Sequence, residues 1–300
     1  MLDFPSANTS TPLLEATELE HLLGHLKQAS QIDLTGYKRS SLLRRTQMRM
    51  QRIGVKNYQN YLDHLQQQPD EVQHLLDTIL INYTYFFRDP FVWNYLANHL
   101  IPQIVANKAP DQLIRVWSAG CASGEETYSL AMMLIEILGV EQFQQRVRIW
   151  GTDADPDAIL QARQGYYLDH GIEAVPEVLR EKYFERRGDR HYWRSDFRRS
   201  ITFQLHNLIQ EPPLPNIDLL VCRNTLMYFT PETQLRTLIR FHFGLEQSGY
   251  LLLGQSENLV TCSHAALFTS IDKQVNVFTK VLDAHRDRRL LPLAFTPLSL

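Results

Sequence analysis

Between residues 113 and 153, two short apolar runs enclose one segment of helical period. The runs LIRVWSA and VRIWGTD are rich in β-branched and aromatic residues, and the apolar residues of EETYSLAMMLIEILG recur with the spacing of a helix. The alternation continues with a strand pattern in IDLLVCRN, a helix pattern in PETQLRTLIRFHFGLEQ and a strand pattern in GYLLLGQSE. Strands that alternate with helices predict an α/β fold built on a doubly wound, mostly parallel sheet.

The rest of the chain predicts three further parts. Residues 15–80 show successive helical periods and predict a small all-helical domain, followed by an α/β domain over 81–282. Within that domain, residues 166–204 interrupt the alternation with short strand patterns around Gly188, which predict a small antiparallel β insertion. Residues 283–300 contain two prolines and no periodicity, so we expect a loose tail.

Composition narrows the class of protein. With 44% hydrophobic and 21% charged residues, the chain has the make-up of a globular protein that buries a core. No stretch reaches the roughly 18 uninterrupted apolar residues of a membrane span, and the first residues lack the pattern of a secretory signal. The three cysteines, Cys121, Cys222 and Cys262, have no CxxC spacing, which argues against disulfides and a zinc site. We therefore expect a cytoplasmic protein without direct membrane insertion or a bound metal.

One segment concentrates positive charge. Residues 31–60 contain seven Lys or Arg residues and a single acid, Asp33, whereas the whole chain has a net charge of −3. In a helix over SLLRRTQMRMQRIG, one side carries Arg44, Arg45, Arg49 and Arg52. Two interpretations stay open, a solvated charged face and a docking surface for an acidic partner. The net charge makes a general attraction to nucleic acid weak.

A glycine-containing turn follows the strand pattern LIRVW. In SAGCASGEE, Gly120 and Gly124 allow the backbone to approach a ligand closely. The spacing is G-x-x-x-G, and neither GxGxxG nor a Lys-containing phosphate loop is present, which disfavours NAD and ATP. Ser123 and Glu126 also satisfy the capping-box pattern, so N-terminal capping of the following helix is an alternative role for Glu126.

An acidic residue ends the next strand pattern. Asp153 in GTDAD is expected at the carboxyl edge of the sheet, where an acid commonly accepts hydrogen bonds from a ribose diol. Helix capping is the alternative role, but Asp155, directly before Pro156, suits a cap better. A glycine turn with an acidic strand end and no phosphate-binding pattern indicates an adenosine ligand without phosphates. S-adenosyl-L-methionine is the obvious candidate.

These motifs, with three others, resemble those of the CheR-type chemoreceptor glutamate methyltransferases. The N-x-T-x-F-F-R segment of that family is similar to Asn82–Arg88, and its R-N-x-x-x-Y-F strand end is similar to Arg223–Phe229. The family's glycine turn, acidic strand end and G-x-S-E strand end resemble WSAGCASGEE, GTDAD and GQSEN. The resemblance runs in order from about Leu23 to Thr279. This chain departs from the family pattern at Thr127, at Met227 and in its short, Arg-rich insertion.

The resemblance implies a class I S-adenosylmethionine-dependent methyltransferase fold and a set of site residues. The cofactor would contact Asn82, Thr84, Arg88, Gly120, Glu126, Asp153, Asn207, Leu208, Arg223 and Asn224. Within this set the family places Asp153 on the ribose and Asn207 and Leu208 on the adenine side. Arg88 and Tyr228 would lie beside the sulfonium and the acceptor. The basic helix would dock the cytoplasmic methylation helices of a chemoreceptor or a similar sensory protein.

The implied reaction suits the residue types present. A glutamate side chain has a pKa near 4.3, so it is already an anionic nucleophile at neutral pH and needs no catalytic base. Positioning such a carboxylate in line with the methyl group supplies much of the rate, and S-adenosyl-L-homocysteine is the product. Two other hypotheses remain. One is a non-catalytic scaffold that binds the cofactor. The other is a nucleic-acid methyltransferase, which is disfavoured because the acid-or-Asn, Pro-Pro, aromatic motif is absent from the end of IDLLVCRN.

Overall fold

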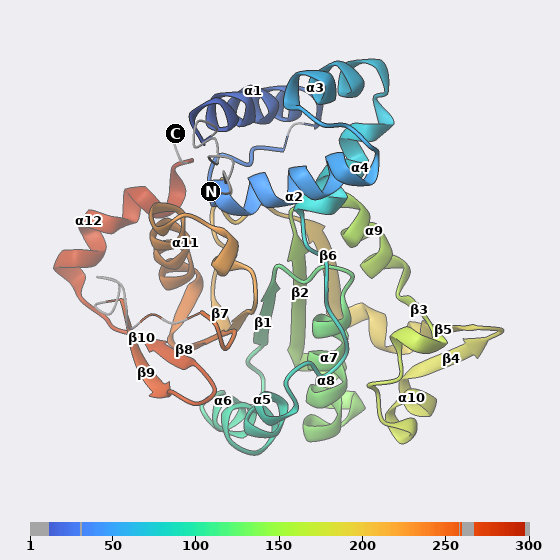
Figure 1. The fold of residues 1–300 in the computed structure, drawn as a ribbon. Helices are drawn as coiled ribbons and strands as arrows, with labels where there is room; N and C mark the ends of the chain where they lie inside the picture. Colours follow the sequence, from blue (N-terminus) through green and yellow to red (C-terminus); the bar gives the residue numbers. More distant parts are fainter. Residues whose placement is uncertain (1–11, 31, 258, 260–266, 298–300) are drawn as a thin grey trace, which may run out of the picture. The chain divides into compact units, whose positions relative to one another are not determined.

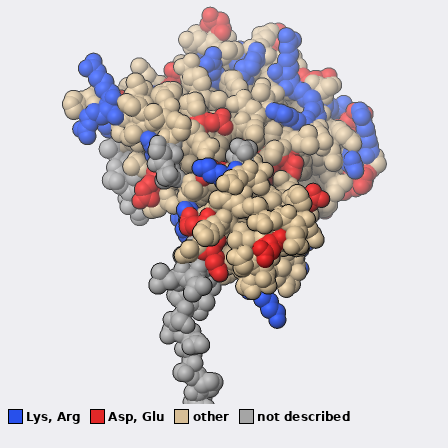
Figure 2. All heavy atoms as spheres, turned by 90° about the horizontal axis from the view of Figure 1, so that it is seen from above, with Lys and Arg blue, Asp and Glu red and all other residues tan. Residues whose placement is uncertain are grey.

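The computed structural model describes residues 12–30, 32–257, 259 and 267–297. Contacts between residues divide the chain into a smaller unit that ends at Ile81 and a larger unit that begins at Asn82. Within the described ranges, no helix combines the length and apolar character needed to cross a membrane. Lys and Arg side chains are interspersed with Asp and Glu on the face drawn in Figure 2.

The smaller unit consists of helices. Its elements are α1 (Pro12–Ser30), α2 (Arg39–Arg52), α3 (Tyr58–Gln67) and α4 (Asp70–Ile79). The turn before α3 is fixed by Asn57, whose side chain accepts a hydrogen bond from the backbone N–H of Asn60 at 2.9 Å. Leu22, Tyr61 and Leu75 have no exposed surface and belong to one apolar cluster shared by the helices. This cluster gives the unit a core of its own.

A buried ion pair lies inside this helical unit. Arg49 of α2 donates two hydrogen bonds to the carboxylate of Glu71 in α4, at 2.8 and 2.5 Å, and Tyr61 donates a third at 2.8 Å. The side chain of Arg49 is 12% exposed and that of Glu71 is 5% exposed. The prediction that Arg49 shares a docking face with Arg44 and Arg52 is therefore wrong, because its guanidinium faces an internal acid that helical periodicity alone does not reveal.

The larger unit is built on a seven-stranded sheet (Figure 1). Its strands are β1 (Ile114–Ala119), β2 (Val147–Asp153), β6 (Ile201–Leu205), β7 (Ile217–Cys222), β8 (Leu245–Leu253), β9 (Phe268–Asp272) and β10 (Val277–Lys280). Their order is β6-β2-β1-β7-β8-β10-β9, and the pairs from β6 to β8 are parallel while β10 is antiparallel to both neighbours. This arrangement confirms the predicted doubly wound, mostly parallel sheet.

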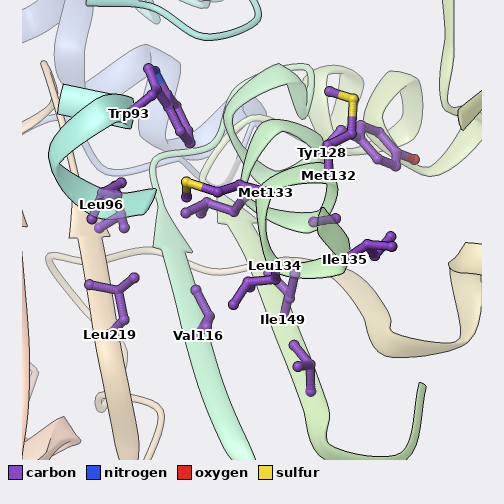
Figure 3. Close-up of a cluster of buried hydrophobic side chains, with 14 of the residues drawn as sticks. Trp93, Leu96, Val116, Tyr128, Met132, Met133, Leu134, Ile135, Ile149 and Leu219 are labelled. Atoms are coloured by element: carbon purple, nitrogen blue, oxygen red, sulfur yellow. The ribbon is translucent and has the colours of Figure 1, made fainter. Parts of the chain in front are cut away.

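Helices and short turns precede β1 or connect the strands. They are α5 (Pro90–Tyr95), the π-helical η1 (Leu96–Leu100), α6 (Ile101–Ala106), α7 (Glu125–Leu138), α8 (Val140–Arg146), α9 (Pro156–Gln164), α11 (Pro231–Gly244) and the 3₁₀ turns η3 (Ser195–Ser200) and η4 (Leu226–Tyr228). Figure 3 shows side chains of α7, among them Met133 and Leu134, lying against Val116 of β1 and Ile149 of β2. All six residues of β7 are buried, as expected for a central parallel strand.

The antiparallel insertion forms a separate small sheet. Its elements are β3 (Tyr166–Leu168), the 3₁₀ turn η2 (Asp169–Gly171), α10 (Glu177–Tyr183), β4 (Phe184–Arg187) and β5 (Arg190–Trp193). The strand order is β3-β5-β4, and Gly188 has a φ of 65° in the turn between β4 and β5. The small sheet ends at Trp193, before the predicted end at residue 204, because residues 201–205 pair with β2 as β6.

The prediction of a loose tail over residues 283–300 is wrong for residues 284–295. Residues 284–295 form α12 (Ala284–Phe295), and α12 packs against α11. Asp283 caps this helix by accepting hydrogen bonds from the backbone N–H groups of His285 and Arg286, at 3.1 and 3.0 Å. Pro292 inside the helix obscured the pattern, and contacts with α11 supply the stabilisation that local propensity does not.

The ion pair in the helical unit gives a stability prediction. Arg49→Ala leaves the buried carboxylate of Glu71 without its partner, so we expect a loss of about 2–4 kcal/mol in the free energy of unfolding of this unit. Arg44→Ala is the matched control at an exposed position of the same helix, and we expect a change within about 0.5 kcal/mol. Urea unfolding followed by circular dichroism measures both. Equal effects of the two substitutions would show that the pair is not stabilising.

Candidate functional site

Several of the residues singled out from the sequence meet at one edge of the large sheet. The parallel strands β1, β2 and β7 are neighbours, so their carboxyl ends lie side by side. Gly120 follows β1, Asp153 ends β2, and Arg223 and Asn224 follow β7. The carboxyl edge of such a sheet, at the point where the strand order reverses, is the usual ligand site of this architecture.

The glycine turn after β1 is held close to the neighbouring strand. The backbone N–H groups of Gly120 and Cys121 both donate to the carbonyl of Thr152, at 2.8 and 2.9 Å. Gly120 has a φ of 76°, and a Cβ atom there would lie 2.3 Å from Oγ1 of Thr225. A side chain at position 120 is therefore excluded both by the backbone conformation and by space.

Asp153 is a half-buried carboxylate held by backbone donors. Its Oδ2 accepts from the N–H of Ala122 at 2.9 Å, and its Oδ1 accepts from the N–H of Asp155 at 3.0 Å. Burial raises the pKa of Asp153, and these backbone hydrogen bonds oppose the rise. Asp155, not Asp153, caps α9, as expected from the sequence. Asp155 also accepts a hydrogen bond from Nδ2 of Asn82 at 2.6 Å, which brings Asn82 to the same edge.

Arg223 links three distant segments through its buried guanidinium. Its Nη2 donates to Oδ2 of Asp89 at 2.5 Å and to the carbonyl of Arg88 at 2.9 Å, and its Nη1 lies 3.4 Å from Oε2 of Glu126. The other oxygen of Glu126 accepts from Ser118 at 2.8 Å. Burial raises the pKa of Glu126, and the charge of Arg223 opposes this rise. The capping-box role for Glu126 is wrong, because its carboxylate points to Ser118 and Arg223.

The segment from Asn82 to Asp89 has unusual backbone geometry. Phe87 and Asp89 have φ values of 52° and 60°, which are uncommon for residues other than glycine and store strain. Phe86 has no exposed surface and packs edge to face on Tyr167 and Phe184, with ring centroids 4.8 and 5.7 Å apart. Phe86 therefore serves packing and anchors this segment to the rest of the unit.

Arg88 occupies a more open position than Arg223. Its Nη1 donates to the carbonyl of Tyr83 at 3.1 Å, and its guanidinium lies 5.7 and 5.8 Å from the ring centroids of Tyr83 and Tyr85. Tyr83 is 71% exposed. The half-buried Thr84 lies between the two tyrosines in sequence. The cation of Arg88 is therefore presented among aromatic rings on a segment whose backbone is fixed by Arg223.

Sequence reasoning missed the role of Glu257. Its Oε2 accepts hydrogen bonds from the backbone N–H groups of Asn224 and Gly254, both at 2.8 Å, and its Oε1 accepts from Met227 at 3.3 Å. Asn224 has a φ of 60°, so this carboxylate holds a strained turn that leads to the half-buried Tyr228 in η4. The only signal was the acid in GQSEN, and its contact with the turn after β7 is tertiary.

Asn207 and Leu208 lie in the loop that follows β6, next to β2. The N–H of His206 donates to the carbonyl of Asp153 at 2.9 Å, which ties the start of this loop to the acidic strand end. Oδ1 of Asn207 accepts from the N–H of Ile209 at 2.9 Å, and Leu208 is buried. The loop therefore adjoins Asp153 on the side away from Gly120.

The remaining residues singled out from the sequence lie elsewhere or serve packing. Arg44 and Arg52 are exposed on α2 of the helical unit, and Arg45 there is half-buried. Cys121 and Cys222 are buried, and burial raises the pKa of both thiols, which keeps them protonated. Cys262 lies outside the described residues. Within the described part of the chain, no group of His, Cys, Asp or Glu side chains has the arrangement of a metal site.

Glu125, next to Glu126 in the sequence, gives a prediction about how stability depends on pH. Glu125 is buried, accepts a hydrogen bond from Ser123 at 2.7 Å, and burial raises its pKa from 4.5 to about 7. Because the folded state holds this proton more tightly than the unfolded state, stability should fall as pH rises from about 5 to 8. Glu125→Gln should therefore raise the free energy of unfolding by about 1–3 kcal/mol at pH 8 and by less than about 1 kcal/mol at pH 5.

Denaturant unfolding at both pH values measures this difference. Glu173→Gln at an exposed position is the matched control and should change neither value by more than about 0.5 kcal/mol. A stabilisation by Glu125→Gln that is the same at pH 5 and pH 8 contradicts the assignment of the pH dependence to this carboxyl group.

Comparisons with known proteins match both units. The family model described as the CheR methyltransferase SAM binding domain matches residues 82–277, and the model of the CheR methyltransferase all-alpha domain matches residues 17–80. A chemotaxis protein methyltransferase of Borreliella burgdorferi is 31% identical over 249 residues, which cover 81% of this chain and 88% of that protein. An uncharacterized 104.1 kDa protein of Rhodobacter capsulatus is 36% identical over 245 residues, or 82% of this chain, but only 26% of that protein is covered.

Among solved structures, a TehB-like SAM-dependent methyltransferase from Corynebacterium glutamicum superposes with a TM-score of 0.33 at 16% identity. The match covers 64% of this chain and 100% of that chain.

Proposed function

Because this chain belongs to the CheR methyltransferase family, we propose that it transfers the methyl group of S-adenosyl-L-methionine to glutamate side chains of a helical, chemoreceptor-like protein. The products are glutamate methyl esters and S-adenosyl-L-homocysteine, and the reaction takes place in the cytoplasm. The observation that carries the proposal is the group of Asp153, Glu126 and Arg223 around the Gly120 turn at the carboxyl edge of the sheet.

The residues at this edge fit the cofactor. Its adenosine carries a ribose diol, which suits the carboxylate of Asp153, and its methionine end carries an ammonium group, which suits the carboxylate of Glu126. Because residue 120 is a glycine, no side chain stands between the turn and Thr225. Nε of Arg223 is buried and has no hydrogen-bond acceptor among the described residues, so this part of the site has donor capacity left. Asn82 and Thr84 complete the methionine end of the site, and Asn207 and Leu208 complete the adenine side.

The reaction requires the chain to position the acceptor carboxylate and does not require a catalytic base. The bound cofactor supplies an electrophilic methyl group on a cationic sulfur. A glutamate carboxylate is ionised at neutral pH, so no proton has to be removed before its oxygen forms the new bond to carbon. Arg88, with paired N–H donors, orients a carboxylate beside Tyr228. The Arg223 network contributes by fixing the backbone of Arg88.

The helical unit supplies the surface for the protein substrate. Arg44 and Arg52 are exposed on α2, where they attract the acidic residues of a methylation helix. Arg49 is excluded from this surface because it is paired with Glu71. Exposed charges act at long range and mainly affect encounter with the partner, so the docking should weaken with salt.

Labelled cofactor distinguishes this function from its alternatives. Incubation with cytoplasmic fragments of chemoreceptors should place base-labile label on glutamate residues. Label on RNA in the same assay would indicate a nucleic-acid methyltransferase. Binding of the cofactor without transfer to any acceptor would indicate a scaffold.

Asp153 gives a prediction for cofactor affinity. Asp153→Asn keeps the shape of the side chain but removes the charge that binds the ribose diol, so we expect the Kd for S-adenosyl-L-homocysteine to rise at least about tenfold, or about 1.4 kcal/mol. Isothermal titration calorimetry measures it, with the exposed Asp111→Asn as control. An unchanged affinity for Asp153→Asn would remove this residue from the ribose site.

The basic surface gives a prediction for the protein substrate. Arg44→Glu with Arg52→Glu should raise the KM for a receptor fragment at least about fivefold at low salt, through reversed electrostatic attraction, while the Kd for S-adenosyl-L-homocysteine stays the same. Arg288→Glu with Arg289→Glu on α12 makes the same change of charge at another exposed site and is the control. Steady-state kinetics at two salt concentrations measures both. If the two double variants behave alike, the α2 surface has no specific role.

A further inference from the structure

Arg240 of α11 is a buried cation whose hydrogen bonds within the described residues go to backbone carbonyls. The residue is 2% exposed. Its Nη1 donates to the carbonyls of Leu208 and Ile209, at 3.1 and 2.7 Å. Its Nη2 donates to the carbonyl of Thr296 at 2.9 Å, and its Nε donates to that of Ala294 at 3.3 Å. Among the described residues it has no carboxylate partner, so one side chain joins the loop after β6 to the end of α12.

On the side of α12, Arg240 occupies a favourable electrostatic position. The last carbonyls of a helix lack partners within the helix and carry the negative end of its dipole. Ala294 and Thr296 belong to the last turn and the C-cap of α12, so Arg240 satisfies two carbonyls at this end. A second contact between the helices lies nearer the start of α12, where Nε2 of His242 is 3.2 Å from Oδ1 of Asp287. Figure 1 shows α12 lying beside α11.

On the side of the loop, Arg240 fixes two consecutive peptide groups. The carbonyls of Leu208 and Ile209 both point to Nη1, which leaves this stretch little freedom to rotate. The start of the same loop is tied to β2, since the N–H of His206 donates to the carbonyl of Asp153. The loop is therefore held at the acidic strand end by His206 and from α11 by Arg240.

The arrangement is energetically costly for a purely structural contact. Desolvation lowers the pKa of Arg240 to about 10, because carbonyl dipoles replace water without a full opposite charge. A well-packed apolar side chain fills such a space without this cost.

The family match ends at residue 277, seven residues before α12 begins at Ala284. The helix that Arg240 engages is thus an addition to the matched region, and the donors of this residue join it to the loop.

We propose that Arg240 is a positioning residue through which α12 sets the conformation of the Asn207–Gln210 loop, so that affinity for the adenosine end of the cofactor depends on the C-terminal helix. The inference rests on the proposed function, in which this loop borders adenine. It assigns a role in the site to a segment outside the family match. Lys at position 240 cannot reproduce the contact, because a single ammonium does not span the loop carbonyls and the helix carbonyls together.

The test compares four full-length variants. Arg240→Lys removes the fork of donors, and Ala294→Leu enlarges a side chain that has no exposed surface, which displaces the end of α12. The double variant tests whether the two act through one connection. Arg288→Lys, exposed on α12, is the matched control. Calorimetry measures the Kd of S-adenosyl-L-homocysteine and of 5′-methylthioadenosine, which keeps the adenosine end and lacks the amino acid, and thermal unfolding checks the fold.

Arg240→Lys and Ala294→Leu should each raise both Kd values by the same factor, about 5- to 20-fold, and the double variant should not exceed the larger single effect. In kinetics with a receptor fragment, the KM for the cofactor should rise while kcat stays within about twofold, since Arg240 does not touch the reacting atoms. Thermal unfolding of Arg288→Lys and its two Kd values should equal those of the wild type.

Several results would overturn the inference. Unchanged Kd values for Arg240→Lys, a loss confined to S-adenosyl-L-homocysteine, or single effects that multiply in the double variant all contradict it, and each leaves the proposed function intact. If Arg240→Lys does not fold, Ala294→Leu decides by the same criteria. A wild-type protein that binds neither ligand would instead contradict the proposed function, and the inference with it.

Discussion

The buried guanidinium of Arg223 is the contact on which the rest of the site depends. It joins the end of β7 to Glu126 at the start of α7 and to Arg88 and Asp89, more than one hundred residues earlier in the chain. A buried cation of this kind is stable only when acids and carbonyls surround it. The segment that carries Arg88 is therefore fixed against the sheet by charge as well as by the packing of Phe86.

Backbone strain and buried or half-buried carboxylates occur together around this contact. Phe87, Asp89, Ala122 and Asn224 all have positive φ values, and all lie in turns at the carboxyl edge or in the segment beside it. Asp153 and Glu257 hold two of these turns by accepting backbone N–H groups, and burial raises the pKa of both acids. Such geometry persists only where surrounding contacts determine it, and it preorganises a site for its ligand. The site therefore gains rigidity at some expense of stability.

Two further parts of the chain lie outside the sheet that carries this site, the helical unit and the C-terminal helix. The helical unit has an apolar cluster of its own and an internal ion pair, and it carries the basic α2 surface. The C-terminal helix lies beyond the family match and contacts the loop after β6 through Arg240. In the proposed function the helical unit concerns the protein substrate, and in the further inference the C-terminal helix concerns the cofactor.

The sequence by itself determined the alternation of strands and helices, the glycine turn, the acidic strand end and the capping role of Asp155, because these follow from local periodicity and from residues close in sequence. Only the tertiary structure decided that Arg49 pairs with Glu71, that Glu126 faces Arg223 instead of capping α7, that Glu257 holds the Asn224 turn, and that residues 284–295 form a helix. Each of these depends on a partner at least twenty residues away in the chain or on packing against another element. The free energy of a buried charge is set by the partners that folding brings to it, and helical or strand periodicity carries no information about them.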